Sequence, residues 1–309
     1  TQAWSKHITD EQALAGLTDS ANEQMAQAAQ DKELDGWLIT LEFPCYYAVM
    51  TYADDRSLRE EVYRAYSTRA SDQGPHAGQL DNSPIMAEIL DLRLELAQLL
   101  GFKNYSELSL STKMAESTEQ VLTFLHDLAQ RSKPFAEQDL TELRAFAAEH
   151  NVKDLNSWDV GYFSEKLREQ RYDISEEELR DYFPIDKVLS GLFAIVEQLY
   201  GIEITELSDF DSWHPDVRLF EITEDGNHVG RFFFDLYARS HKRGGAWMDG
   251  ARDKYRDSNG TLINPIAYLV SIFTPASQGK PALLTHDEVT TLFHEFGHGL
   301  HHMLTRIEF

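Results

Sequence analysis

The sequence predicts a mainly α-helical protein with one small β-sheet, an α+β fold. Apolar residues recur at helical spacing from residue 9 to about residue 201, and several of these runs have clear start and stop signals. Near residue 213 this period gives way to segments of β-branched and aromatic residues separated by a turn signal. The helical period then returns at the end of the chain. We therefore expect a mainly helical region, 1–205, followed by a region, 206–309, that holds the sheet and a final helix.

The clearest helix of the first region is expected after residue 82. Ser83 has the character of an N-cap, with Pro84 at the first helical position, and Gly101 is expected to end the helix. Its apolar residues follow a helical period: Ile85, Ile89, Leu92, Leu96 and Leu100. This spacing predicts an amphipathic helix.

Further helices have equally recognisable ends. Two pairs have the spacing of a capping box: Ser117 with Gln120, and Ser175 with Glu178. An apolar run at 185–200 is closed by Gly201, which suits a helix C-terminus. The run at 140–148 continues a long helix, and we expect Pro134 to interrupt that helix.

The second region begins with a predicted β-hairpin. Its strands, 217–223 and 229–237, flank the pair Asp225 and Gly226, which tolerates the positive φ angles of a tight turn. A third strand is expected at 267–274, between two prolines. A small sheet therefore precedes the final helix.

Charge and composition exclude several classes of function. The 309 residues include 28 Lys and Arg against 52 Asp and Glu, a net charge of −24 at pH 7. Binding to nucleic acid or to an anionic membrane needs clustered basic residues, so we expect neither partner. No run of 18 apolar residues is present, so no membrane span is predicted.

The single cysteine, Cys45, cannot form an internal disulfide, which favours a reducing, cytoplasmic location. We also expect a monomer. The sequence starts without Met and without a secretory leader, which predicts either a processed chain or an internal piece of a longer one.

One segment contains the candidate metal-binding and catalytic residues. Five of the twelve histidines lie between residues 286 and 302, in a predicted helix that starts with a capping box of Thr285 and Glu288. Within it, His294 and His298 are four residues apart, so their imidazoles lie on one helix face and can share a zinc ion. Glu295 follows the first histidine, where its carboxylate can hold a metal-bound water. The segment is thus an HExxH motif.

The alternative to a metal site is a chance match in a structural helix. A chain of this composition would contain some HExxH about one time in twenty, so the pattern alone is moderately specific. Gly297 is unfavourable in a helix interior, and both a close approach by substrate or backbone and simple close packing explain it. His301 and His302 lie about 10 and 12 Å along the helix from His294, too far to complete its site.

A wider similarity accompanies the motif. The segment HDEVTTLFHEFGHGLHHMLTRIE resembles the active-site helix of the thimet oligopeptidase family of zinc metallopeptidases. Three upstream segments resemble the same family: REEVYRAYSTRASDQGP, GRFFFDLYARSHKRGGAWMDGA and NPIAYLVSIFTPASQGKPALLTHDEV. The resemblance implies a zincin-like metallopeptidase fold of the neurolysin and thimet oligopeptidase type, here incomplete, with region 206–309 as part of the catalytic domain. It also implies a cytosolic enzyme whose deep channel admits short peptides.

The resemblance assigns roles to three residues. It makes His294 and His298 ligands of one Zn²⁺ and Glu295 the general base and proton shuttle of a peptidase. The family takes its third ligand, a Glu, from the next helix, more than twenty residues beyond the second histidine. Only eleven residues follow His298, and Glu308 is their sole carboxylate.

We therefore expect this chain to lack the third ligand, together with the family's downstream His and Tyr that stabilise the oxyanion. We expect an internal fragment of a peptidase, truncated at its C-terminus, and it stays open whether the fragment is itself active. The alternative is a non-catalytic helical module that binds a peptide or a partner.

Two upstream features have open interpretations. The family aligns peptides along a strand edge, and 268–274 matches that region, although an ordinary core strand explains it as well. Four charged residues end the second hairpin strand: Asp235, Arg239, Lys242 and Arg243. A solvated edge and a substrate contact are both compatible with them.

Overall fold

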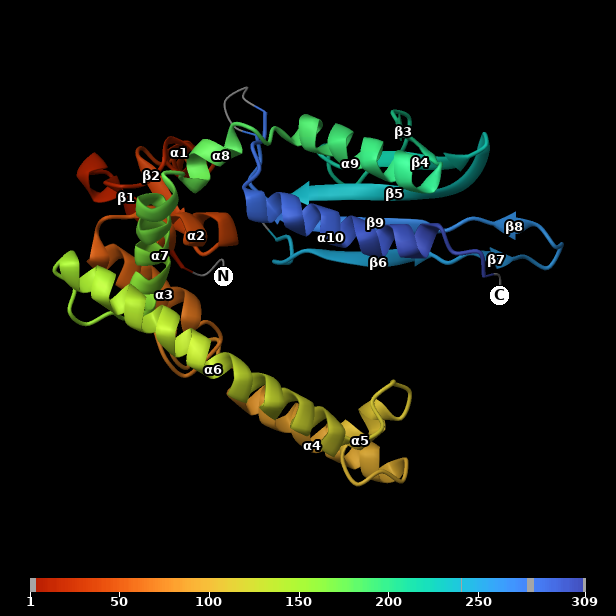
Figure 1. The fold of residues 1–309 in the computed structure, drawn as a ribbon, viewed down its shortest axis with the longest axis horizontal. Coiled ribbons are helices and arrows are strands. Elements are labelled where there is room, and N and C mark those ends of the chain that lie inside the picture. The colour runs from red at the N-terminus through yellow and green to blue at the C-terminus, as the bar shows by residue number, and fades with distance from the viewer. Residues whose placement is uncertain (1–3, 240, 277–280, 308–309) are drawn as a thin grey trace. The chain divides into compact units, whose positions relative to one another are not determined.

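Figure 1 shows the computed structural model of the protein, which describes residues 4–239, 241–276 and 281–307. The chain divides into two compact units. Unit 1 comprises residues 49–167, and unit 2 combines residues 2–48 with residues 168–309. The boundary expected at 205/206 falls inside unit 2, within one strand of its main sheet, and as a domain boundary it stays a prediction.

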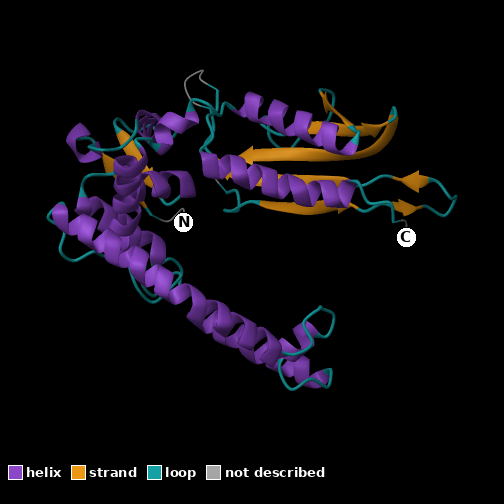
Figure 2. Ribbon diagram, viewed as in Figure 1, coloured by secondary structure: helices purple, strands orange, loops and turns teal. Residues whose placement is uncertain are grey.

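Unit 1 consists of helices and their connections (Figure 2). They are α3 (Arg56–Ser67), α4 (Ser83–Leu99), α5 (Tyr105–Leu110) and α6 (Thr118–Glu149), with α2 (Phe43–Tyr52) and α7 (Ser157–Tyr172) at the two boundaries with unit 2. The predicted α class of this part of the chain is confirmed.

Helix α4 confirms the predicted element and corrects two details. Its N-cap is Asn82, and Ser83 is already helical, because the Asp81 carboxylate accepts hydrogen bonds from both the backbone N–H and the hydroxyl of Ser83. All five residues of its predicted apolar face are exposed, and Ala97 is the buried position of the helix. Helical spacing therefore predicted the helix correctly but did not predict what covers it.

Helix α6 is continuous across Pro134, so the predicted interruption is wrong. Proline cannot donate a hydrogen bond to the carbonyl one turn before it, at Gln130. Both residues are exposed, so water can bind that carbonyl. Ser117 caps the helix, since its hydroxyl accepts a hydrogen bond from the N–H of Gln120 at 3.1 Å. The predicted capping box is only half formed, because the Gln120 side-chain oxygen accepts from the N–H of Glu116.

The burial along α6 gives a matched pair of substitutions. Leu143 is 7% exposed in a cluster with Phe146, Ala147 and Phe163, whereas Leu125 of the same helix is 52% exposed. We expect Leu143→Ala to lower the free energy of unfolding by about 2–5 kcal/mol. Leu125→Ala should change it by less than about 0.5 kcal/mol. Urea titration of the two variants measures both values, and equal losses would contradict the burial described here.

Unit 2 contains the remaining elements. They are β1 (Ser5–Ile8), the 3-10 helix η1 (Glu11–Leu14), α1 (Asp19–Gln30), β2 (Trp37–Thr40), α8 (Glu176–Arg180), α9 (Ile185–Tyr200), β3 (Glu203–Leu207), β4 (Arg218–Glu224), β5 (Asn227–Tyr237), β6 (Trp247–Arg252), β7 (Tyr255–Arg256), β8 (Leu262–Ile263), β9 (Ile266–Phe273) and α10 (His286–Met303). The capping box of Ser175 and Glu178 and the C-terminal Gly201, at φ +68°, are confirmed.

The main sheet has the strand order β3-β4-β5-β9-β6, in which β5 and β9 are parallel and the other neighbours antiparallel. The predicted hairpin is confirmed, with Asp225 and Gly226 both at positive φ. The third strand predicted is β9, and of the two interpretations of 268–274 the structure bears out the core strand and not the strand edge, because β9 pairs with β5 on one side and with β6 on the other. The edge strand on this side of the sheet is β6.

Helices α9 and α10 cover one face of this sheet (Figure 1). The core between them is largely aromatic, and Phe296 of α10 packs among Phe193, Phe232 and Phe234 with ring centroids 5.3–6.0 Å apart. Burial of such large side chains contributes about 1.5–3 kcal/mol each. This core fixes α10 against the strands.

Three of the four charged residues that follow the buried part of β5 form an ion-pair cluster and not a solvated edge. Asp235 is buried, and its carboxylate accepts two hydrogen bonds from Arg239, one from Lys242 and one from Trp213. Burial alone would raise the pKa of Asp235, but these hydrogen bonds outweigh it and hold that pKa well below its usual range. The fourth residue, Arg243, instead lies over the Trp247 ring, 5.3 Å from its centroid.

Two predictions from composition concern the rest of the fold. Among the described helices, none is long and apolar enough to cross a membrane. Cys45 is buried, and burial raises the pKa of its thiol to about 11. A thiol with that pKa is protonated at neutral pH, so Cys45 is not a nucleophile there.

Candidate active site

Helix α10 begins at a strongly fixed N-terminus. The predicted capping box is confirmed: the Thr285 hydroxyl accepts from the N–H of Glu288, and the Glu288 carboxylate accepts from the N–H of Thr285 at 2.8 Å. The same carboxylate accepts from the N–H of Thr274, just after β9. Glu176, at the start of α8, accepts from the N–H of His286. These bonds tie the helix to the end of β9 and to α8.

The two sides of α10 have opposite characters. Leu292, Phe296, Leu300 and Met303 are buried against the sheet, while His294 and His298 lie on the exposed side. The helix approaches the sheet closely at Gly299, where a Cβ atom would lie 3.2 Å from the Leu269 side chain. The packing therefore directs the histidines away from the core.

Gly297 does not have the close packing that was one explanation of it. A Cβ atom built there would meet no described atom within 4 Å. Gly299 is the packing glycine of this helix, and the motif alone gave no sign of the difference. The other explanation, an approach by substrate, stays a prediction.

His294 and His298 converge as the motif predicts. Their Nε2 atoms are 3.2 Å apart, and the two ring planes are 81° from parallel. Two nitrogens that bind one zinc ion at about 2.0–2.1 Å with tetrahedral angles are separated by roughly 3.3 Å. The pair therefore fits a shared zinc ion with little movement of either ring. In the described part of the chain no group of three or more His, Cys, Asp or Glu is placed to hold a metal, and Glu308 lies outside that part.

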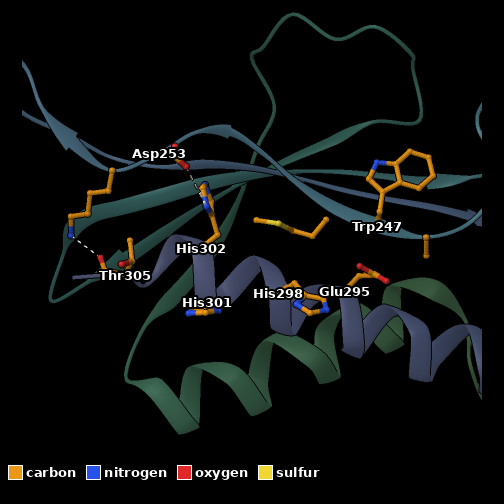
Figure 3. A pocket seen from close by; sticks show the side chains of 10 residues that line it. Trp247, Asp253, Glu295, His298, His301, His302 and Thr305 are labelled. Atoms are coloured by element: carbon orange, nitrogen blue, oxygen red, sulfur yellow. Dashed lines mark hydrogen bonds and ion pairs between the residues drawn. The ribbon is translucent and has the colours of Figure 1, made fainter. Parts of the chain in front are cut away.

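A pocket of about 640 Å³ lies between β6 and α10 (Figure 3). Glu295 and His298 line it from the helix, and Trp247 and Met248 line it from the strand. Asp253, His302 and Thr305 lie toward its other end (Figure 3), and Lys254 also lines the pocket. Glu295 is half-buried and is one of the residues that line this pocket.

The structure brings His294 and His298 together, and it places Glu295 and His298 on the lining of the pocket, to which β6 also contributes. His294 is not among the lining residues. Strand β6 is not predictable from its residues, because the segment WMDGAR contains charges and a glycine and lacks β-branched residues. An edge strand needs less β-propensity than a central one, so edge strands are harder to predict from residue patterns than central strands. His301 lies in the same pocket, and His302 is bonded to the strand rather than to the histidine pair.

Comparison with known proteins decides the family. Residues 49–309 match peptidase family M3, which covers most of the chain. The chain belongs to peptidase family M3. This result confirms the resemblance inferred from the motif and from the upstream segments, and membership of family M3 supports a zincin-like fold.

Relatives in family M3 include bacterial and plant proteins. Over its full length the chain is 58% identical to oligopeptidase A of Salmonella typhimurium and covers 46% of that protein. Over 99% of its length it is 44% identical to an organellar oligopeptidase A, chloroplastic/mitochondrial, of Arabidopsis thaliana, and covers 40% of it. Over 97% of its length it is 33% identical to dipeptidyl carboxypeptidase of Escherichia coli, and covers 44% of it.

The chain therefore spans about half the length of the curated relatives it matches. Two Arabidopsis thaliana relatives are named for different compartments, one as chloroplastic/mitochondrial and one as a probable cytosolic oligopeptidase A, so the cytoplasmic location of this chain stays a prediction.

Proposed function

We propose that this chain carries the catalytic helix of a zinc-dependent endopeptidase that hydrolyses short peptides. The observation that supports it is the convergence of His294 and His298, with Nε2 atoms 3.2 Å apart, beside a glutamate that faces a pocket. Membership of peptidase family M3 and relatives named oligopeptidase A support the same reaction class. The reaction is the hydrolysis of a peptide bond by water.

In this proposal the three residues have distinct roles. His294 and His298 would hold one zinc ion through their Nε2 atoms. When bound, zinc supplies a Lewis acid for the scissile carbonyl and for the attacking water. Glu295 takes a proton from that water at its carboxylate and later gives it to the leaving amine. Trp247 and Met248 form the opposite wall, and the edge of β6 offers main-chain groups with which an extended peptide can pair.

A second candidate is a module that binds peptides without cleaving them. It is favoured by one observation: among the described residues, no third ligand joins the histidine pair. Two histidines alone bind zinc weakly. Both candidates bind a peptide in the same pocket, and they differ in whether the chain hydrolyses that peptide.

Metal binding by the histidine pair tests the proposal directly. We expect the chain to bind one zinc ion, and His298→Ala to lower that affinity at least about tenfold because one of two ligands is lost. The measurement is competition between the chain and a chromogenic zinc chelator. The matched control is His301→Ala, which removes an exposed histidine three residues further along α10 and should leave zinc affinity unchanged.

Equal effects of the two substitutions would contradict the assignment of the pair. Cleavage of a quenched short peptide by the zinc-loaded chain then separates the endopeptidase from the binding module.

A further inference from the structure

The end of β6 is bonded to the last turn of α10. His302 Nε2 lies 3.0 Å from the carbonyl oxygen of Arg252, a distance at which the ring N–H donates a hydrogen bond to that oxygen. The Nδ1 atom lies 3.8 Å from the Asp253 carboxylate, and the His302 side chain is 17% exposed. His302 is therefore held in place between helix and strand (Figure 3).

The strand is shaped at this point to meet the helix. The pairing of β6 with β9 shifts between Gly250 and Arg252, so Ala251 is a bulge, and a bulge bends an edge strand. At Gly250 a Cβ atom would lie 3.1 Å from Cε1 of His302, so the glycine leaves room for the ring. Beyond the bulge, Lys254 Nζ donates a hydrogen bond to the Thr305 carbonyl at 3.0 Å.

We propose that His302 is a positioning residue that clamps β6 to α10 and thereby sets the width of the pocket opposite Glu295. The proposal rests on the proposed function, since it concerns how a peptide lies in that pocket. In the described part of the sheet β6 pairs on one side only, so fewer backbone bonds hold it than hold β9. The bond from His302 supplies the missing restraint.

The clamp also limits how much of the strand can pair with a peptide. Because the Arg252 carbonyl already accepts from His302, a peptide added to the edge can pair with β6 only as far as the bulge. The ligand class is therefore an extended peptide with a short paired segment.

Hydrogen exchange tests the clamp without any peptide or metal. We expect His302→Phe, which keeps an aromatic ring and loses the donor, to speed amide exchange in 247–254 about tenfold, in keeping with the loss of one hydrogen bond. His302→Gln can still donate and should recover most of the protection. The matched control is His301→Phe, which changes the neighbouring, exposed histidine of α10 in the same way.

Gly250 gives a second, independent variant. We expect Gly250→Ala to speed exchange in 247–254, because the added Cβ pushes the His302 ring away. In a His302→Ala background the same change should add little, since the group it would meet is gone. Additive effects of the two substitutions would contradict a direct coupling between Gly250 and His302.

Peptide affinity then tests the consequence for the pocket. A fluorescein-labelled octapeptide is titrated against zinc-loaded protein carrying Glu295→Gln, so that binding is measured without cleavage. We expect His302→Phe to weaken the affinity about tenfold and His302→Gln to restore it. Zinc content should be the same in all three proteins.

Unchanged exchange and unchanged affinity in His302→Phe would overturn the clamp. If the octapeptide binds to no form of the protein, the proposed function fails, while the exchange experiment still decides whether the clamp exists.

Discussion

Replacing Glu295 by glutamine is expected to abolish peptide cleavage while zinc binding persists. Glutamine has the size of glutamate but cannot accept the proton of the attacking water, and general-base catalysis typically contributes about 10²–10⁴-fold. His294 and His298 are untouched, so the metal affinity should stay within about twofold of the parent value. The largest predicted effect on activity is therefore confined to one carboxylate.

The measurement is hydrolysis of a quenched short peptide by the 309-residue chain, and by any longer form that contains it, with zinc content determined on the same samples. Asp287→Asn serves as a matched control, because it removes an exposed carboxylate from the first turn of the same helix. Full cleavage by the Glu295 variant would refute its role as general base. If both variants lost the same cleavage activity, the cause would be a disturbed helix α10 and not the loss of proton transfer by Glu295.

Residue patterns predicted the site well because its geometry is local. An HExxH motif needs only a helix to bring its two histidines onto one face, and the capping box of Thr285 and Glu288 marked that helix. The same holds for the hairpin at Asp225 and Gly226, whose positive φ angles follow from the residue types alone. Such features depend on neighbours within a few residues.

Features that depend on distant partners were not predictable in this way. Strand β6 exists because β9 offers it a partner, and its own residues show no strand pattern. The hydrogen bond from Trp213 to Asp235 likewise joins residues 22 positions apart, although the other partners of Asp235, Arg239 and Lys242, are close in the chain. On α4 the apolar spacing that ordinarily faces a core is exposed, since spacing states which residues share a face and not what covers it.

The proposed clamp at His302 depends both on local sequence and on a distant contact. Its position in the last turn of α10 followed from the motif, which also excluded it as a ligand of the His294 site on grounds of distance. Its bond to Arg252 spans 50 residues and depends on a bulge at Ala251. His302, for which the residue pattern predicts no role, thus has the proposed role of holding β6 against α10.

The largest expected effect on stability comes from Asp159 in unit 1. This carboxylate is fully buried and accepts hydrogen bonds from Arg56 and from Arg59, whose side chain is 2% exposed. Asp159→Asn keeps the shape but removes the charge, which leaves the Arg59 guanidinium buried without its counter-ion. Breaking one partner of a buried ion pair costs about 3–5 kcal/mol.

The matched control is Asp127→Asn, which breaks another Arg–Asp pair of unit 1. Asp127 pairs with Arg131 on the surface of α6, where both side chains are more than half exposed. Exposed pairs of this kind contribute about 0–1 kcal/mol. Urea titration at neutral pH should therefore show a large decrease in the free energy of unfolding for the Asp159 variant and a small decrease for the Asp127 variant.

The pH dependence of that loss identifies its cause. Burial alone would raise the pKa of Asp159, but the hydrogen bonds from Arg56, the Asn156 N–H and Arg59 outweigh it and hold the pKa below its ordinary value. A carboxyl group whose pKa is lowered by folding stabilises the protein above its unfolded pKa, near 3.9, and loses that contribution as the pH falls through its folded pKa. The difference between parent and Asp159→Asn should therefore be constant from neutral pH to about pH 5 and shrink below about pH 4. A difference that persists unchanged in acid would assign the loss to packing instead of to the charge.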